Sequence, residues 1–129
     1  MAIKRIGSGS SWEDLVGYSR VVRAGNLVEV AGTLAVDGNG TLVGGNSMYE
    51  QARFILSKMV RYVEMAGGYK EDITRTRVYV TDISRWQEVA KAHHELFSDV
   101  RPVTSMVEVK ALIGKEYLVE IELSAVLTS

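Results

Sequence analysis

The sequence contains no cysteine and a single proline among its 129 residues. A chain without cysteine has no disulfide, no thiolate nucleophile and no cysteine-ligated zinc or iron–sulfur centre. No apolar run approaches the roughly 20 residues that a membrane-spanning helix needs. The first seven residues, Met-Ala-Ile-Lys-Arg-Ile-Gly, lack the apolar stretch of a signal peptide. We therefore expect a cytoplasmic protein.

An excess of charge of one sign is also missing. The 15 Lys and Arg residues balance 16 Asp and Glu residues, which gives a net charge of -1. Such a surface lacks the positive field that attracts nucleic acid or an anionic membrane, and we expect neither as a partner. The length and the 47% apolar share are those of an ordinary globular domain. The sequence predicts one domain over residues 1–129.

The N-terminal half predicts three strands, at residues 2–6, 19–24 and 27–32. Gly25-Asn26 has the length and composition of a two-residue hairpin turn between the second and third of them. Glycine-rich and serine-rich segments at residues 7–11 and 37–45 predict loops. Neither loop contains a nucleophile elbow or a phosphate-binding glycine pattern.

Two helices follow from periodicity and from their end signals. Ser47 with Glu50 fits a capping box, apolar residues recur at helical spacing, and Gly67-Gly68 supplies a stop. A second helix is capped by Asp82 or Ser84, has its apolar face between Trp86 and Phe97, and cannot continue past Pro102. It carries His93 and His94, which point about 100° apart and cannot chelate one ion together. We interpret His93 as a partly buried packing residue.

The last strands, residues 73–81, 104–113 and 117–127, complete the order β-β-β-α-β-α-β-β. This order predicts an α+β fold in which two helices cover one face of a mixed sheet. The strands at 104–113 and 117–127 predict a hairpin with a three-residue loop, which places Lys110 opposite Glu120. The second sheet face would then carry Thr104, Met106, Glu108, Lys110, Glu120 and Glu122. We expect another subunit to bury that face, because Met106, Leu118 and Val126 lie among the polar groups.

Two sets of charged residues are candidates for chemistry. Arg75 and Arg77 share a strand face with Tyr79. They are either exposed or paired with carboxylates of a subunit interface, or they form a strip that binds the carboxylate of a substrate. Glu120 is either neutralised by Lys110 or buried at an interface, where it would hold a water or a substrate nitrogen and, with a raised pKa, transfer a proton. The residues alone leave these alternatives open.

Seven segments together resemble the RidA/YjgF family. They are residues 17–20 (Gly-Tyr-Ser-Arg), 30–33 (Val-Ala-Gly-Thr), 51–53 (Gln-Ala-Arg), 66–68 (Ala-Gly-Gly), 76–82 (Thr-Arg-Val-Tyr-Val-Thr-Asp), 101–109 (Arg-Pro-Val-Thr-Ser-Met-Val-Glu-Val) and 118–122 (Leu-Val-Glu-Ile-Glu). The match extends from about Gly17 to the end of the chain. The resemblance implies a chorismate-mutase-like fold assembled as a homotrimer, with small-molecule clefts between subunits. Archetypal members are enamine/imine deaminases, hydrolases that release 2-oxo acids and ammonia without a metal or cofactor.

The resemblance also assigns roles to residues. Glu120 matches the catalytic glutamate, and the substrate-binding positions correspond to Tyr18, Ala31, Gly32, Thr104, Ser105 and Met106. Ala31 stands where the archetype has a serine. Thr104 stands where it has the arginine that binds the substrate carboxylate, so the chain resembles an arginine-lacking branch of the family. Arg75, Arg77 and Arg101 are the candidates for anion binding from another direction.

Three functions follow as hypotheses. The first is a cofactor-free hydrolase of reactive enamine, imine or related carbonyl metabolites, with Glu120 handling the proton. The second, motivated by Thr104, is a non-catalytic trimer that binds a small ligand or a partner protein. The third is a ribonuclease, which the net charge of -1 disfavours.

Overall fold

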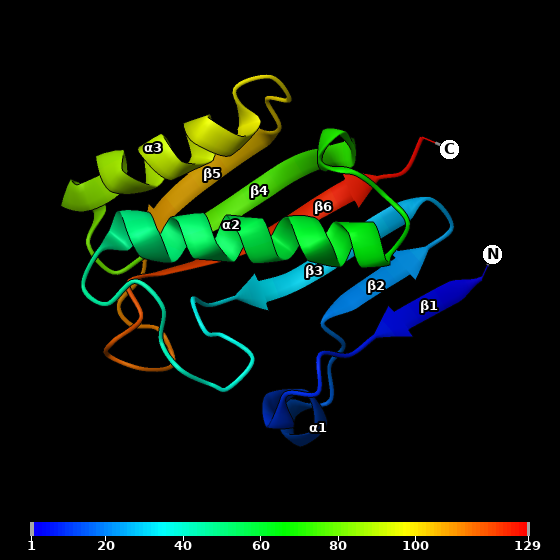
Figure 1. Ribbon diagram of the computed structural model, residues 1–129, viewed down its shortest axis with the longest axis horizontal. Helices are drawn as coiled ribbons and strands as arrows, with labels where there is room; N and C mark the ends of the chain where they lie inside the picture. The colour runs from blue at the N-terminus through cyan, green and yellow to red at the C-terminus, as the bar shows by residue number, and fades with distance from the viewer. Residues whose placement is uncertain (1, 129) are drawn as a thin grey trace.

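Six strands form one sheet in the order β1-β2-β3-β6-β4-β5 (Figure 1). Their bounds are Ile3–Ile6 (β1), Val21–Ala24 (β2), Leu27–Thr33 (β3), Ile73–Val80 (β4), Val103–Glu108 (β5) and Val119–Val126 (β6). β4 and β5 are parallel, and the other neighbouring strands are antiparallel. The computed structural model describes residues 2–128, so Met1 and Ser129 of the predicted domain lie outside the described residues.

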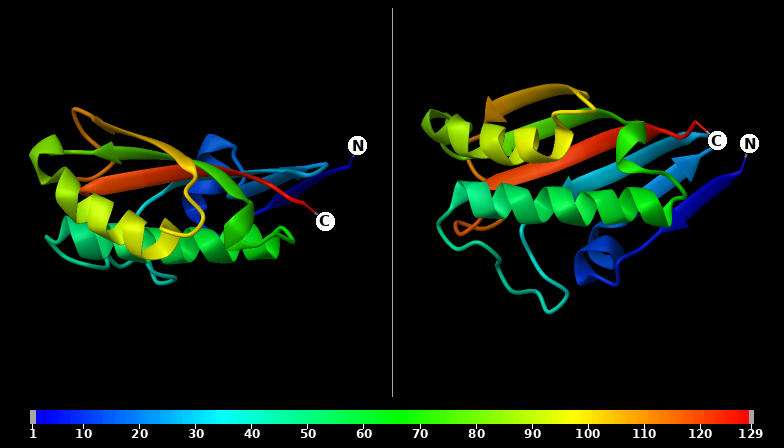
Figure 2. Two further views of the ribbon diagram at one scale, coloured as in Figure 1. Left: turned by 90° about the horizontal axis from the view of Figure 1, so that it is seen from above. Right: turned by 45° about the horizontal axis from the view of Figure 1, so that its top comes forward.

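Both long helices lie on the same face of the sheet. α2 (Met48–Met65) and α3 (Trp86–Phe97) cover this face, and the opposite face is left uncovered by the chain (Figure 2). The short helix α1 (Ser11–Val16) lies beyond one end of the sheet (Figure 1). Two 3₁₀ turns, η1 (Lys70–Asp72) and η2 (Ile83–Arg85), precede β4 and α3. The predicted α+β class with a mixed sheet and two helices on one face is confirmed.

Local signals in the N-terminal half are confirmed where they predict turns and caps. Ala24 pairs with Leu27 across a two-residue turn. The Ser47 side chain accepts a hydrogen bond from the Glu50 amide and so caps α2. Gly67, with φ of 98°, ends that helix in the left-handed region, which glycine adopts at little cost.

Helix α1 was not predicted, because residues 7–11 read as a loop. The Ser10 side chain accepts a hydrogen bond from the Trp12 amide and starts the helix one residue later. The second helix also begins differently from the prediction. Asp82 caps the 3₁₀ turn η2 through the Ser84 amide, and α3 then starts at Trp86 without a side-chain cap.

The predicted hairpin of residues 104–113 with 117–127 is wrong. β6 pairs with β3 on one side and β4 on the other, whereas β5 is the edge strand beyond β4. Glu120 lies opposite Tyr79 instead of Lys110. The reason is the apolar face of β6, where Val119, Ile121, Leu123 and Ala125 are all buried. Such a strand is stabilised most at the centre of the sheet, with an apolar neighbour on each side.

The corrected pairing also changes which residues share a face. Thr104 and Met106 lie opposite Thr76 and Val78, which are buried under the helices. Thr104, Met106 and Glu108 therefore belong to the helix-covered face, not to the face of Glu120 and Glu122 as predicted. Ile73, predicted on the face of Arg75, is buried because the pairing of β4 with β6 shifts register between these two residues.

Gln51 fixes the connection between β5 and β6. Its side chain is fully buried on α2. Nε2 donates to the carbonyls of Gly45 (2.8 Å) and Glu116 (3.0 Å), and Oε1 accepts from the amide of Leu118 at 3.0 Å. The Gln51 side chain thus forms hydrogen bonds with three backbone groups in loops, where no neighbouring strand provides them.

Replacing Gln51 by leucine is expected to lower the free energy of unfolding by about 1–3 kcal/mol, because three backbone groups lose their partner while the volume is kept. Urea unfolding followed by circular dichroism measures the change. Ser57→Ala, on the exposed side of the same helix, is the control and should stay within about 0.5 kcal/mol. Equal effects of the two substitutions would contradict this role of Gln51.

Candidate functional site

Glu120 lies on the uncovered sheet face, above the backbone of Gly32. Its neighbours Val119 and Ile121 are fully buried under the helices, so the alternation of β6 turns Glu120 to the opposite face. A Cβ atom added to Gly32 would lie 2.9 Å from Glu120 Oε2. Glycine at position 32 therefore leaves the space that the carboxylate occupies.

The environment of Glu120 disfavours its ionised form. Burial raises the pKa of Glu120 above its ordinary value, the charge of Arg20 opposes this rise, and the charge of Glu122 reinforces it. A carboxyl with a raised pKa holds its proton closer to neutral pH than a surface glutamate does. The group is therefore suited to accept and return a proton.

Arg20 joins the segment before β2 to the end of β3. Its Nη1 donates to the Gly32 carbonyl at 2.8 Å and to Thr33 Oγ1 at 3.2 Å, and its Nη2 donates to the Tyr18 hydroxyl at 3.0 Å. Its Nε lies 3.6 Å from Glu13 Oε2, and both side chains are buried. The guanidinium thus fixes Tyr18 and Gly32 relative to each other.

Glu13 compensates the buried charge of Arg20. The Ser8 amide donates to Glu13 Oε1 at 2.9 Å, and the Ser8 hydroxyl donates to Oε2. Burial alone would raise the pKa of Glu13, but the Ser8 hydrogen bonds and the Arg20 charge hold it below its ordinary value. Arg20 is paired with Glu13, and its other N–H groups donate to Gly32, Thr33 and Tyr18. It is therefore a scaffold residue rather than a free anion site.

Arg77, Glu122 and Tyr79 form a second polar group on the same face. The Tyr79 hydroxyl donates to Glu122 Oε1, and Arg77 Nη1 lies 3.9 Å from Glu122 Oε2. Arg77 is thus exposed and also paired with a carboxylate of its own chain. Ser105 lies opposite Arg77 in the register, and Arg75 lies opposite Val103 and Ser124.

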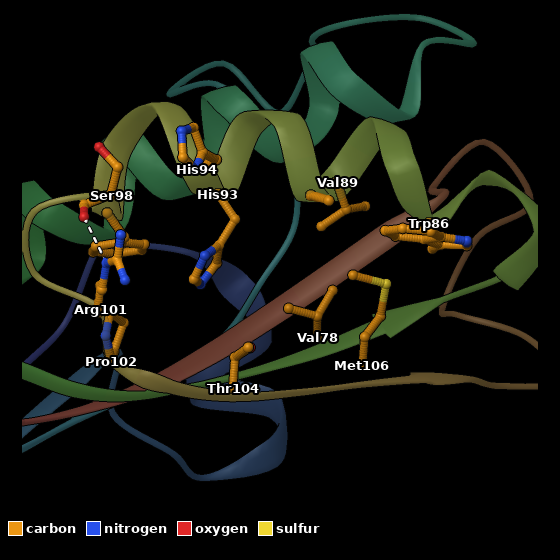
Figure 3. Close-up of a pocket in the computed structure, with 12 residues that line it drawn as sticks. Val78, Trp86, Val89, His93, His94, Ser98, Arg101, Pro102, Thr104 and Met106 are labelled. Atoms are coloured by element: carbon orange, nitrogen blue, oxygen red, sulfur yellow. Dashed lines mark hydrogen bonds between the residues drawn. The ribbon is translucent and has the colours of Figure 1, made fainter.

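A cavity of about 430 Å³ opens on the other side of the sheet, between α3 and β5 (Figure 3). Thr104 and Met106 of β5 line it, together with Trp86 and His93 of α3. Arg101 also lines the cavity and donates from Nε to the Ser98 carbonyl at 3.0 Å. The residues that the family resemblance groups together therefore lie in two places, on opposite faces of the sheet.

Thr76, His93 and Thr104 are linked by hydrogen bonds at this cavity. Thr76 Oγ1 lies 2.7 Å from Thr104 Oγ1 and 2.9 Å from His93 Nε2. The His93 ring also packs against Phe97, with ring centroids 4.7 Å apart. Burial lowers the pKa of His93, so the imidazole is held in its neutral form. The interpretation of His93 as partly buried is right, but it omitted these polar partners.

Three residues of these two places were not singled out from the sequence. Arg20 had a signal, because it follows Tyr18 in the segment 17–20 that resembles the family. Thr76 had one as well, since the alternation of the strand at residues 73–81 puts it on one face with Val78 and Val80, where a hydroxyl needs a partner. Glu13 lies five residues from Ser8, and no pattern predicts their contact.

Within residues 2–128, no three His, Cys, Asp or Glu side chains are close enough together to hold a metal ion. In the same range, no helix combines the length and hydropathy that crossing a bilayer requires.

Comparison with known proteins defines the class. Residues 9–127 match the endoribonuclease L-PSP family, also called the YjgF or RidA family, and the chain belongs to this family. The crystal structure of Rv2704 from Mycobacterium tuberculosis, a YjgF/YER057c/UK114 family member, has 46% sequence identity and a TM-score of 0.88, covering 98% of this chain and 100% of that one.

Two relatives illustrate the range of the family. The protein SCO2049 of Streptomyces coelicolor, described as uncharacterized, is 39% identical over 124 residues, which are 96% of this chain and 92% of that protein. The 3-aminoacrylate deaminase RutC of Acinetobacter baylyi is 28% identical over 107 residues, which are 83% of this chain and 84% of that protein.

The raised pKa of Glu120 predicts a pH-dependent effect of Glu120→Gln on stability. The folded wild-type protein holds this proton more tightly than the unfolded chain, so its free energy of unfolding falls as pH rises from the ordinary carboxyl range through the raised pKa. Glutamine does not ionise and avoids this loss. The stability of Glu120→Gln relative to wild type should therefore increase between about pH 4 and about pH 7.

Urea unfolding at several pH values measures this difference. Glu64→Gln, on the exposed surface of α2, serves as the control and should show no such increase. A constant or decreasing advantage of Glu120→Gln over that range would contradict the raised pKa.

Proposed function

We propose that the chain is a cofactor-free hydrolase of small reactive enamine, imine or related carbonyl metabolites, with Glu120 as the catalytic residue at clefts between the subunits of a homotrimer. The observation that carries the proposal is the half-buried Glu120 carboxyl, whose pKa is raised and which lies against the backbone of Gly32. The relationship to a 3-aminoacrylate deaminase, 28% identical, supports the reaction class.

The reaction needs a group that both accepts and donates a proton. In imine hydrolysis, Glu120 takes a proton from water as the water oxygen bonds to the imine carbon. The protonated carboxyl returns this proton to the nitrogen, which gives a carbinolamine. The carboxylate then takes the proton of the carbinolamine hydroxyl and passes it to the nitrogen, so that the carbon–nitrogen bond breaks, ammonia leaves and the carbonyl forms. Ammonia and a carbonyl compound are the products, and no electron acceptor is required.

Assembly is proposed because the site residues of one protomer face in opposite directions. Glu120 lies against Gly32, which Arg20 links to Tyr18, whereas Thr104 and Met106 line the cavity on the helix side of β5. One small ligand cannot contact both sets within a single chain, because the sheet lies between them. The two sets could act on the same ligand only where the edge of one subunit meets the uncovered face of another.

The uncovered face has the composition of an interface. Val103 and Val107 are exposed on the edge strand β5. Leu27 of β3 and Val126 of β6 are exposed elsewhere on the same face. These apolar side chains flank the polar centre that contains Glu120. A soluble protein buries such a patch against a partner more often than it leaves it in water. In the proposed trimer the partner is a second copy of the chain.

A non-catalytic binding protein is the second candidate, and the observation that favours it is Thr104. Threonine carries no charge and cannot form the two-pronged contact that arginine makes with a substrate carboxylate. A trimer of this kind would bind a ligand in the same clefts without turning it over. The two candidates differ in whether Glu120 changes the rate of a reaction.

Turnover separates them. We expect the protein to accelerate the decay of 2-iminopropanoate or of 3-aminoacrylate, each generated in situ and followed by ammonia release, and Glu120→Gln to reduce the rate by about 10²-fold or more. Glu29→Gln changes a glutamate of β3 on the same sheet face and should retain the wild-type rate. A folded wild-type protein without acceleration on either compound would favour the binding candidate.

The mass of the particle in solution is the second test. Sedimentation equilibrium should give three times the 14.2 kDa of one chain. Val107→Arg, which puts a charge into the exposed apolar part of β5, should shift the particle toward the monomer. A stable wild-type monomer at micromolar concentration would end the proposal of inter-subunit clefts.

A further inference from the structure

The cavity between α3 and β5 combines apolar walls with an uncharged polar centre. Trp86 and Met106 lie together at one end, and Val78 lies between them and Thr104 (Figure 3). The side chains of His93 and Thr104 approach each other at the centre of the cavity (Figure 3). Trp86 is 49% exposed, so a large aromatic surface is available to a ligand.

Hydrogen-bond counting shows what this centre offers. The Thr76 hydroxyl has one hydrogen, which it donates to Thr104 Oγ1 at 2.7 Å. In the tautomer that carries its hydrogen on Nε2, His93 then donates to Thr76 Oγ1 at 2.9 Å. In this arrangement the hydrogen of Thr104 itself is not used within the group. Thr104 is exposed and can donate that hydrogen outward, to an acceptor atom of a ligand.

The positive charge of the cavity lies at one end of it. Arg101 lies at the opposite end of the cavity from Trp86 (Figure 3), and its Nε donates to the Ser98 carbonyl. Its backbone has a φ of 58°, which is unusual for a residue other than glycine. The Arg101 side chain is exposed, so water screens its attraction for a carboxylate at Thr104, and this attraction offsets only part of the cost of taking the carboxylate out of water.

We propose that this cavity binds an uncharged small molecule with an aromatic or other flat apolar body, which contacts Trp86 and Met106, and a carbonyl oxygen that accepts a hydrogen bond from Thr104. The inference rests on the proposed function for its link to turnover, where it predicts that neutral carbonyl or imine compounds are preferred over amino-acid-derived carboxylates. Binding itself requires no turnover.

Benzamide and benzoate are matched probes, because they have the same shape and differ in charge. We expect benzamide to bind the full-length protein with a Kd of about 1 mM, the range for a ligand of this size, and benzoate at least tenfold more weakly. Titrations followed by NMR on the Trp86 indole N–H and the His93 ring report binding at this cavity.

Thr104→Val removes the donor and keeps the shape, and it should weaken benzamide binding about fivefold. Thr74→Val changes a threonine of β4 away from the cavity and should leave the affinity unchanged. Thr104→Arg introduces the missing charge and should reverse the preference, so that benzoate binds more tightly than benzamide.

Three results would overturn the proposal. They are equal or tighter binding of benzoate by the wild-type protein, equal affinities of the Thr104→Val and Thr74→Val variants for benzamide, and no response of Trp86 or His93 to benzamide up to about 20 mM. Loss of benzamide binding would leave an observed imine hydrolysis intact. Conversely, a protein inactive on imines can still bind benzamide, so the two proposals fail separately.

Discussion

The strict alternation of side chains along β6 determines which face of the sheet carries Glu120. Val119, Ile121, Leu123 and Ala125 are buried under the helices, which forces Glu120 to the uncovered face. A shift of one residue would expose four core side chains, so the position of the carboxyl is as well fixed as the core itself. The space above Gly32 then admits the carboxyl, and burial there raises its pKa. A structural constraint of the core thus positions a titratable group.

Charge compensation explains why the same region gives no obvious anion site. The buried Arg20 is held by Glu13 and by acceptors of the protein itself, and Arg77 is paired with Glu122. On the other side of the sheet, Thr104 is linked through Thr76 to His93, and the exposed Arg101 lies at the end of the cavity opposite Trp86 (Figure 3). Arg20 and Arg77 are therefore committed to partners within the chain. In the site proposed at this cavity, a substrate recognised through a carboxylate would gain less than an uncharged one, because threonine at position 104 carries no charge.

Local signals predicted the first hairpin, the start and end of α2 and the turn of Glu120 away from the core, because each depends on residues close in sequence. Strand pairing did not follow, because it depends on competition among distant strands. Residues 104–113 and 117–127 fit a hairpin by their own pattern, yet β6 gains more by lying between β3 and β4. That single error placed Thr104 on the same sheet face as Glu120. The contact of Thr76 with His93 was accessible in principle, since both are polar residues on faces predicted to be buried.

The energetics of Glu120 bear on the choice between a hydrolase and a binding protein. A half-buried carboxyl next to Glu122 has a raised pKa, so its ionised form is less stable than that of an exposed glutamate. A protein that only holds an uncharged ligand gains nothing from such a group, because a glutamine or an alanine would fit the space above Gly32 without the penalty. A hydrolase gains a carboxyl that holds and returns a proton more readily than an exposed glutamate does. The unfavourable position of this carboxyl is thus easier to explain by catalysis than by binding alone.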